Sequence, residues 1–168
     1  MLNDIVSPIQ SAFVSNRLIQ DNIIIVQEIY HSLEKRKSNG AENMVIKLDM
    51  NKSYDRMEWN FIESVLKAFG FHPKWVKLIM ECITTTSYRI KVNGALSRKI
   101  IPSRGLRQGY PLSPYLFILA AEVLTALMKE AQEQGRIKGF KIAPTAPTLT
   151  HLLFADDCII LAEATVKE

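Results

Sequence analysis

Cysteines and long apolar runs are both scarce in this sequence, and each scarcity excludes a class of protein. The only two cysteines, Cys82 and Cys158, lie far apart, so they form neither a disulfide framework nor the close spacing of a zinc site. We therefore expect an intracellular, reducing environment. No run approaches the roughly 18 apolar residues of a membrane span, and residues 1–10 lack the apolar core of a secretory signal peptide. We therefore expect neither a membrane-spanning segment nor a secretory signal peptide.

Internal repeats, low-complexity tracts and legible Ser-His-Asp or Cys-His arrangements are also missing. His31, His72 and His151 have no ligand spacing, so we do not expect metal ligands among them. What remains is an ordinary globular composition, 48% apolar and 23% charged over 168 residues, which suffices for one domain with a sizeable core. The net charge of +4 permits binding to a polyanion but does not require it.

Hydrophobic periodicity and turn residues predict a mixed α+β fold, an antiparallel sheet covered by helices. Helices are expected over residues 16–37, 59–69, 74–84 and 113–134. Strands are expected at residues 44–48, 88–92, 98–101, 139–142 and on both sides of the 154–157 turn.

Local signals set several of these boundaries. A breaker at residues 38–40 ends the first helix, Gly70 caps the second, and Pro73 opens the third. Asn93-Gly94 predicts a tight hairpin turn. We expect Asp55 to be a helix N-cap, and Trp59 and Trp75 to lie in the core.

The stretch Phe154-Ala155-Asp156-Asp157 carries the strongest chemical signal. Two adjacent carboxylates repel each other, and a divalent cation is the usual reason to hold them together. Asp49 ends another apolar strand, and pairing of the two strands would bring three carboxylates together, as two-metal phosphoryl or nucleotidyl transfer requires. The alternative is that each aspartate is an ordinary turn or cap residue.

A second candidate is the loop Arg104-Gly105-Leu106-Arg107-Gln108-Gly109. Its two glycines allow the backbone to approach a polynucleotide closely, and Arg107 can meet a phosphate. Glycine-rich loops that are simply solvated are common, so the loop alone decides nothing.

Taken together and in order, these segments resemble the reverse transcriptase domain of LINE-type, non-LTR retrotransposons, particularly the plant form. The resemblance covers nearly the whole chain. It rests on these stretches: Ser7 to Phe13, Arg17 to Asn22, Lys47 to Met50, Tyr54-Asp55-Arg56, Glu58-Trp59, Val92-Asn93-Gly94, Arg104 to Gly109, Pro111 to Pro114, and Phe154 to Asp157.

The resemblance implies a right-hand polymerase palm with partial fingers, acting as an RNA-directed DNA polymerase. Asp49 and Asp156 match the metal-binding aspartates, and Asp157 their acidic neighbour. The implied cofactor is two Mg²⁺ ions, for which Mn²⁺ can substitute. The implied partners are an RNA template, a DNA primer and a dNTP. Tyr54 matches the residue under the deoxyribose, and Gln108 and Gly109, beside Arg107, match the loop at the nucleotide and template.

Domain boundaries and departures follow from the same resemblance. Residues 1–43 are expected to hold a fingers-side helix, and residues 44–168 the palm with inserted fingers elements. Thumb, endonuclease and RNase H regions are expected to be absent, and activity can depend on them. The family usually has Asp where Tyr110 stands, and Ser-Lys-Ala where Asn51-Lys52-Ser53 stands. The alternatives to a polymerase domain are a non-catalytic truncated remnant and a metal-independent nucleic-acid-binding module.

Overall fold

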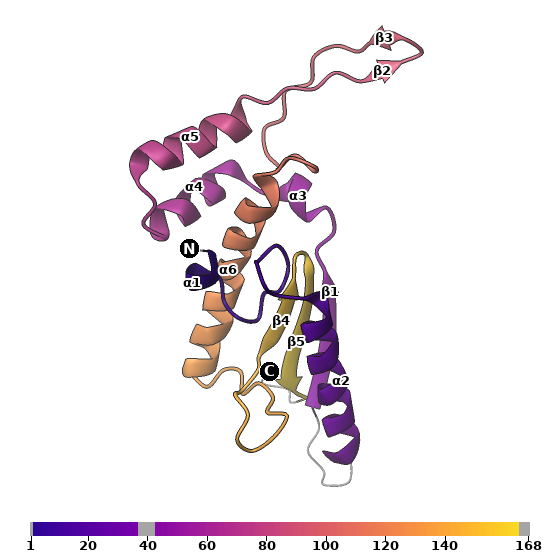
Figure 1. Cartoon of the computed structure of the whole chain (residues 1–168), viewed down its shortest axis with the longest axis vertical. Coiled ribbons are helices and arrows are strands. Elements are labelled where there is room, and N and C mark those ends of the chain that lie inside the picture. The colour runs from indigo at the N-terminus through magenta and orange to yellow at the C-terminus, as the bar shows by residue number, and fades with distance from the viewer. Residues whose placement is uncertain (1, 37–42, 165–168) are drawn as a thin grey trace. The chain divides into compact units, whose positions relative to one another are not determined.

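The computed structural model describes residues 2–36 and 43–164 (Figure 1). The chain divides into two compact units, one of residues 1–51 and 121–168 and the other of residues 52–120. The elements in chain order are α1 (Leu2–Ile5), α2 (Ile19–Arg36), β1 (Asn43–Asp49), α3 (Ser53–Arg56), α4 (Trp59–Ala68), α5 (Pro73–Thr84), β2 (Lys91–Val92), β3 (Ala95–Leu96), α6 (Ser113–Glu133), β4 (His151–Phe154) and β5 (Asp157–Glu163).

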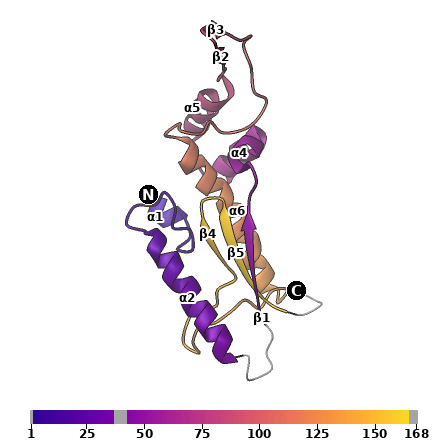
Figure 2. The same ribbon diagram turned by 90° about the vertical axis from the view of Figure 1, so that its right-hand side faces the viewer.

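The first unit is built on a three-stranded antiparallel sheet in the order β1-β5-β4. Successive residues of a strand point to opposite faces, so Leu152 and Leu153 enter different cores. Leu152 packs in a cluster with Ile29 of α2, whereas Leu153 packs with Ala121 of α6. The sheet is therefore covered on one face by α2, beside it in Figures 1 and 2, and on the other by the part of α6 in this unit.

Strand β1 differs from the buried strand that its apolar sequence predicts. Its first three described residues are half-buried, but the four from Ile46 to Asp49 are exposed. Ile46 is 36% and Leu48 43% exposed. The reason is position, because β1 pairs with β5 and has no second strand beside it among the residues that the structure describes.

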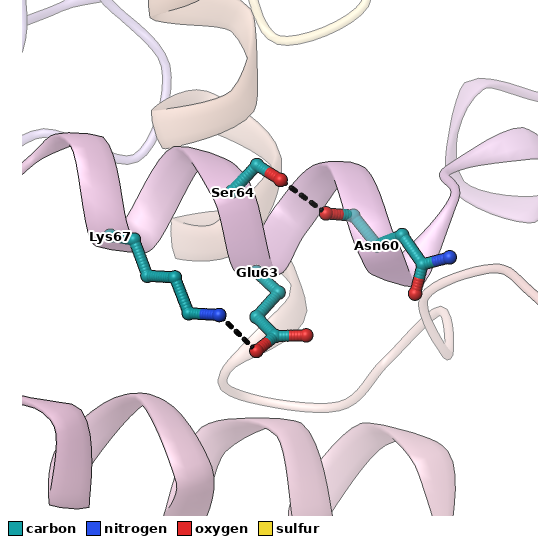
Figure 3. A network of polar contacts seen from close by, with 4 residues as sticks. All are labelled: Asn60, Glu63, Ser64 and Lys67. Carbon is teal, nitrogen blue, oxygen red and sulfur yellow. Dashed lines mark hydrogen bonds and ion pairs between the residues drawn. The ribbon is translucent and has the colours of Figure 1, made fainter.

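The second unit contains the paired helices α4 and α5 and the β2–β3 hairpin. Ile62, Val65 and Leu66 of α4 are buried, as are Val76 and Ile79 of α5. On the exposed side of α4, Ser64 Oγ donates to the Asn60 carbonyl at 2.9 Å, and Lys67 pairs with Glu63 at 2.6 Å (Figure 3). Pairs of this kind contribute only a few tenths of a kcal/mol, about 0.3–0.5, so the apolar contacts dominate.

Several predicted boundaries are confirmed. Gly70 adopts φ 77° just beyond α4, and its N–H donates to the Lys67 carbonyl at 2.9 Å. Pro73 is the first residue of α5. Asn93 and Gly94 both have positive φ at the tip of the β2–β3 hairpin, as this turn type requires.

Other boundaries require correction. Helix α2 begins at Ile19 rather than residue 16, because Asn16 has a left-handed φ of 64° that a helix cannot contain. The predicted breaker at residues 38–40 lies outside the described residues. The second hairpin arm pairs directly after the turn, at Ala95–Leu96, and the expected strand at 98–101 is reduced to one bridge between Tyr88 and Ile100. Likewise, the expected strand at 139–142 is one bridge at Phe140.

Three side-chain predictions were wrong or incomplete. Asp55 is not an N-cap: it lies inside α3, and Glu58 precedes α4. Trp75 is 48% exposed rather than buried in the core. Trp59 is half-buried and donates a hydrogen bond from its indole nitrogen. Over residues 2–36 and 43–164, no helix combines the length and the apolar character needed to cross a bilayer.

Candidate active site

Three aspartates meet at one end of the sheet in the first unit. Asp49 is the last residue of β1 and Asp157 the first of β5, and the two are directly opposite in the antiparallel register. Asp156 occupies the two-residue turn between β4 and β5, and its carbonyl accepts a hydrogen bond from the Met50 N–H at 3.3 Å. The strand pairing expected from the sequence therefore forms.

The side chains around this end include a lysine that the sequence analysis did not single out. Lys47 stands two residues before Asp49, on the same face of β1, and its Nζ lies 3.2 Å from Asp157 Oδ1. Both side chains are largely exposed, so the ion pair contributes little to stability, about 0–1 kcal/mol. Its effect is electrostatic, because it places a positive charge beside two like-charged carboxylates. Alternation along β1 was the signal that could have identified Lys47.

The aspartates provide the type of ligand that a divalent cation prefers, but they do not enclose an ion. Carboxylate oxygens are the ligands that Mg²⁺ prefers, and Mg²⁺ is usually bound by one or two carboxylates together with substrate phosphates and water. Among residues 2–36 and 43–164, no three acidic, histidine or cysteine side chains converge closely enough to enclose an ion. The site thus matches an ion that arrives with a phosphate-bearing ligand.

The strands behind the aspartates are tightly buried. Cys158, next to Asp157, is completely buried, and burial raises the pKa of its thiol to about 11. His151 begins β4 and is 3% exposed, and burial lowers the pKa of its imidazole from the ordinary 6.5 to about 4. Both groups are consequently neutral near pH 7, and the only formal charges contributed by β4 and the first two residues of β5 come from Asp157.

The glycine-rich loop lies in the second unit, where three hydrogen bonds fix it. The Gly105 N–H donates to the Met57 carbonyl and the Leu106 N–H to the Tyr54 carbonyl, both at 2.8 Å. Trp59 Nε1 donates to the Gly105 carbonyl at 2.9 Å. Gly105 has φ +95°, and a Cβ there would lie 3.0 Å from the Asp55 carbonyl oxygen, so this close approach requires glycine.

A cavity of about 280 Å³ opens at this loop. Arg107 and Gln108, both predicted site residues, line it together with Arg104 and Tyr88. The Arg107 guanidinium lies over the Tyr88 ring, 5.8 Å from its centre, a cation–π arrangement. Gly109 has φ 80° but is not among the lining residues. Asp55 also lines the cavity, and the Arg104 guanidinium is paired with Glu58 at 3.1 Å. The Arg107 guanidinium, the Gln108 amide and the Tyr88 ring are groups suited to a phosphate and a base.

Tyr54 also belongs to the second unit, on α3. Its ring stacks on that of Phe117, with the centroids 4.8 Å apart and the planes inclined by 9°. Phe117 is 2% exposed, so the stacking fixes a half-buried tyrosine against a rigid helix. The sequence placed Tyr54 either in the core or at the site, and this partner was not visible there because Phe117 is 63 positions away (117 − 54).

Comparison with known families identifies the chain. A sequence model described as reverse transcriptase (RNA-dependent DNA polymerase) matches residues 1–167. The chain belongs to the reverse transcriptase family. Its relatives include Pol polyproteins of non-LTR, LINE-type retrotransposons, and enzymes of this family generally use divalent metal ions.

Individual relatives support the assignment. An uncharacterised mitochondrial protein of Arabidopsis thaliana is 59% identical over 66 residues, which is 39% of this chain and 54% of that protein. The Pol polyprotein of a type-1 retrotransposable element R2 from Popillia japonica is 32% identical over 86% of this chain and 22% of the polyprotein. The chain thus spans about half of the first protein and about a fifth of the second.

A solved structure agrees at the level of the fold. Telomerase from Candida tropicalis, truncated of its C-terminal domain, superposes with a TM-score of 0.61 at 18% identity, over 94% of this chain and 30% of that one. The polymerase fold expected from the sequence is therefore confirmed.

Proposed function

We propose that this reverse transcriptase-family chain contributes the polymerase core for DNA synthesis on an RNA template, adding a dNTP to a primer 3′-hydroxyl. The observation that carries the proposal is the meeting of Asp49, Asp156 and Asp157 at one end of the sheet. Residues 44–168 would form the palm with inserted fingers elements, and residues 1–43 the fingers-side helix.

The three aspartates would have unequal roles. Asp49 and Asp156 would hold two Mg²⁺ ions, with Mn²⁺ as a substitute. When bound, such ions supply activation of the primer oxygen and charge neutralisation for the triphosphate and the leaving pyrophosphate. Asp157, already paired with Lys47, would add negative charge beside them rather than complete the coordination.

The second unit would hold the nucleic acid and the nucleotide. Arg107 and Gln108 at the cavity would contact phosphate and base, and Tyr54, fixed by Phe117, would pack under the sugar of the incoming dNTP. The β2–β3 hairpin adds basic groups, because the 14 residues from 88 to 101 contain no acidic residue. Its exposed cations are Arg89, Lys91, Arg98 and Lys99. A basic surface of this kind favours a polynucleotide backbone without reading its sequence.

Primer extension on an RNA template with Mg²⁺ or Mn²⁺ tests the proposal. Whatever incorporation the 168-residue chain shows without the thumb and endonuclease regions, Asp156→Ala should lower it by about 100-fold or more. Glu28→Gln, which removes one exposed carboxylate from α2, is the matched control and should retain full activity.

Two results would reject the proposal. Incorporation that survives in Asp156→Ala would remove the aspartate from the reaction. A chain that neither incorporates dNTPs nor binds Mn²⁺ would be a non-catalytic remnant. Salt-sensitive RNA binding that persists in such a chain and in Asp156→Ala would identify a metal-independent binding module instead.

A further inference from the structure

The segment from Val6 to Asn22 contains two stretches of the family pattern, Ser7 to Phe13 and Arg17 to Asn22, yet none of its residues has a role in the chemistry above. In the structure it lies along the outer edge of β4. Gln10 and Leu153 form a parallel bridge. The Ser11 N–H donates to the Leu153 carbonyl at 3.2 Å, and the Leu153 N–H donates to the Ile9 carbonyl at 3.0 Å. The segment therefore forms one parallel bridge next to the residues that lead into the aspartate turn.

The side chain of Gln10 reaches the turn itself. Gln10 is completely buried, and its Oε1 accepts two hydrogen bonds, from the Ala12 N–H at 2.9 Å and from the Ala155 N–H at 3.1 Å. One bond fixes the side chain to its own loop, and the other fixes the first residue of the turn. Ala155 directly precedes Asp156.

Ala155 is a residue that needs such a partner. It is buried at 8% exposure and has φ 53°, a left-handed conformation that is strained for any residue with a Cβ. The favoured two-residue hairpin turns require positive φ at this position, because the other turn types splay the strands. Any shift of Ala155 away from this conformation would carry Asp156 with it, because the two residues share a peptide unit.

Further contacts make the segment rigid enough to act as a brace. The Arg17 guanidinium donates to three carbonyls of the same loop, those of Val6 at 3.0 Å, Ser7 at 2.5 Å and Gln10 at 2.6 Å. Asn22 Nδ2 donates to the Leu153 carbonyl at 3.0 Å. Burial raises the pKa of the Glu122 carboxyl on α6, and the nearby backbone of Ser7 lowers it in part, so the start of the loop lies beside α6. The loop is thus fixed to itself and to β4.

We propose that Gln10 is a positioning residue that holds the strained Ala155-Asp156 turn, and through it the Asp156 carboxylate, in the geometry required for a divalent ion. The part of this inference that concerns the metal ion rests on the proposed function. The part that concerns the hydrogen bond from Ala155 to Gln10 does not, because that bond is a property of the folded chain alone.

Three substitutions separate the hydrogen bond from simple packing. Gln10→Met keeps the length of the side chain and removes the acceptor. Gln10→Glu keeps an oxygen acceptor at the same position. It replaces the Nε2 group, which has no hydrogen-bond partner among the described residues. Ile29→Val removes one methyl group from the core cluster that contains Ile29 and Leu152. It is the control for a modest loss of stability at a residue outside the aspartate turn.

The first measurement is hydrogen exchange of the Ala155 amide by NMR, in the metal-free chain. We expect exchange about three- to ten-fold faster in Gln10→Met than in Ile29→Val, and rates close to wild type in Gln10→Glu. The second is Mn²⁺ titration followed by electron paramagnetic resonance. We expect affinity to fall by about three- to ten-fold in Gln10→Met, to remain in Ile29→Val and to recover in Gln10→Glu.

Equal hydrogen-exchange rates of the Ala155 amide in Gln10→Met and Ile29→Val would refute the stabilisation of the turn by Gln10, whatever the Mn²⁺ affinities are. Faster exchange with unchanged Mn²⁺ affinity would overturn its role in positioning Asp156. If the wild-type chain binds no Mn²⁺, the proposed function fails, and with it the metal half of this inference, while the exchange result still decides the brace. Should Gln10→Met not fold, Gln10→Asn withdraws the acceptor by one methylene and takes its place in both measurements.

Discussion

Acidification should destabilise this protein through one buried imidazole. His151 begins β4, the strand that leads to the aspartate turn, and it is 3% exposed. Its Nδ1 lies 2.8 Å from Thr150 Oγ1 and its Nε2 lies 3.2 Å from Thr125 Oγ1. Hydroxyl groups can rotate to accept from an imidazolium, so hydrogen bonding does not oppose protonation. Burial does, and it lowers the pKa of His151 to about 4.

The sign and size of the effect follow from linkage. Between pH 6.5 and about 4, the unfolded chain protonates His151 and the folded chain does not, so the unfolded state gains protons and stability falls as the pH falls. Each pKa unit corresponds to about 1.4 kcal/mol. The full window therefore costs about 3 kcal/mol, a large share of the roughly 5–15 kcal/mol by which domains are stable.

Urea unfolding monitored by circular dichroism at several pH values from 7.5 to 4 provides the assay. His151→Gln cannot titrate, so its free energy of unfolding should lack this contribution, and the difference between wild type and variant should change by about 3 kcal/mol across the window. Carboxylates titrate in both proteins and cancel in that difference. His31→Gln, at an exposed position of α2, should follow the wild-type curve. Parallel curves for wild type and His151→Gln would refute the reasoning.

Three further outcomes are expected. A thiol reagent at pH 8 should modify Cys82, which is partly exposed. It should modify Cys158 only after unfolding, because burial raises the pKa of that thiol to about 11. Equal modification rates of the two cysteines in a timed labelling experiment would contradict this. The double substitution Arg98→Gln and Lys99→Gln should weaken RNA binding and lower the slope of log affinity against log salt by about one for each lost phosphate contact. A fluorescence anisotropy series at several salt concentrations measures this slope, and an unchanged slope would exclude the hairpin from phosphate binding. Lys47→Met should tighten Mn²⁺ binding several-fold, about two- to five-fold for one exposed charge; weaker binding in the titration would contradict the electrostatic argument.

Helix boundaries could be predicted from the sequence because the signals that set them are local. Gly70 and Pro73 terminate and start helices through their own backbone preferences, and the Asn93-Gly94 turn needs no partner. The register that places Asp49 opposite Asp157 was also predictable in outline, since both aspartates end apolar strands. A right-hand polymerase topology came from the motif order, which local propensity alone could not supply.

Side-chain environments could not be predicted in the same way. The exposed half of β1 has an apolar sequence, and only the strand order shows that it stands at an edge. Trp75 occupies a helix face that looks apolar in sequence, but its exposure depends on what packs against α5. Gln10 lies within a motif that was recognised, yet its contact with Ala155 spans 145 positions (155 − 10). No local pattern carries information over that separation.

The aspartate end of the sheet combines several arrangements that cost stability. Asp49 and Asp157 are like charges directly opposite each other, a pairing that is unfavourable in a sheet. Ala155 is held at positive φ, and Ile46 and Leu48 expose apolar surface on the edge strand beside it. Lys47 offsets the repulsion and Gln10 opposes the backbone strain, so two of these three costs have an identifiable partner within the same unit. Such costs are retained where a ligand relieves them, and a divalent ion held by Asp49 and Asp156 would reduce the repulsion among the three carboxylates. The folding stability of the chain should therefore depend on that ion, which makes Mn²⁺-dependent unfolding a test of the site that requires no catalysis.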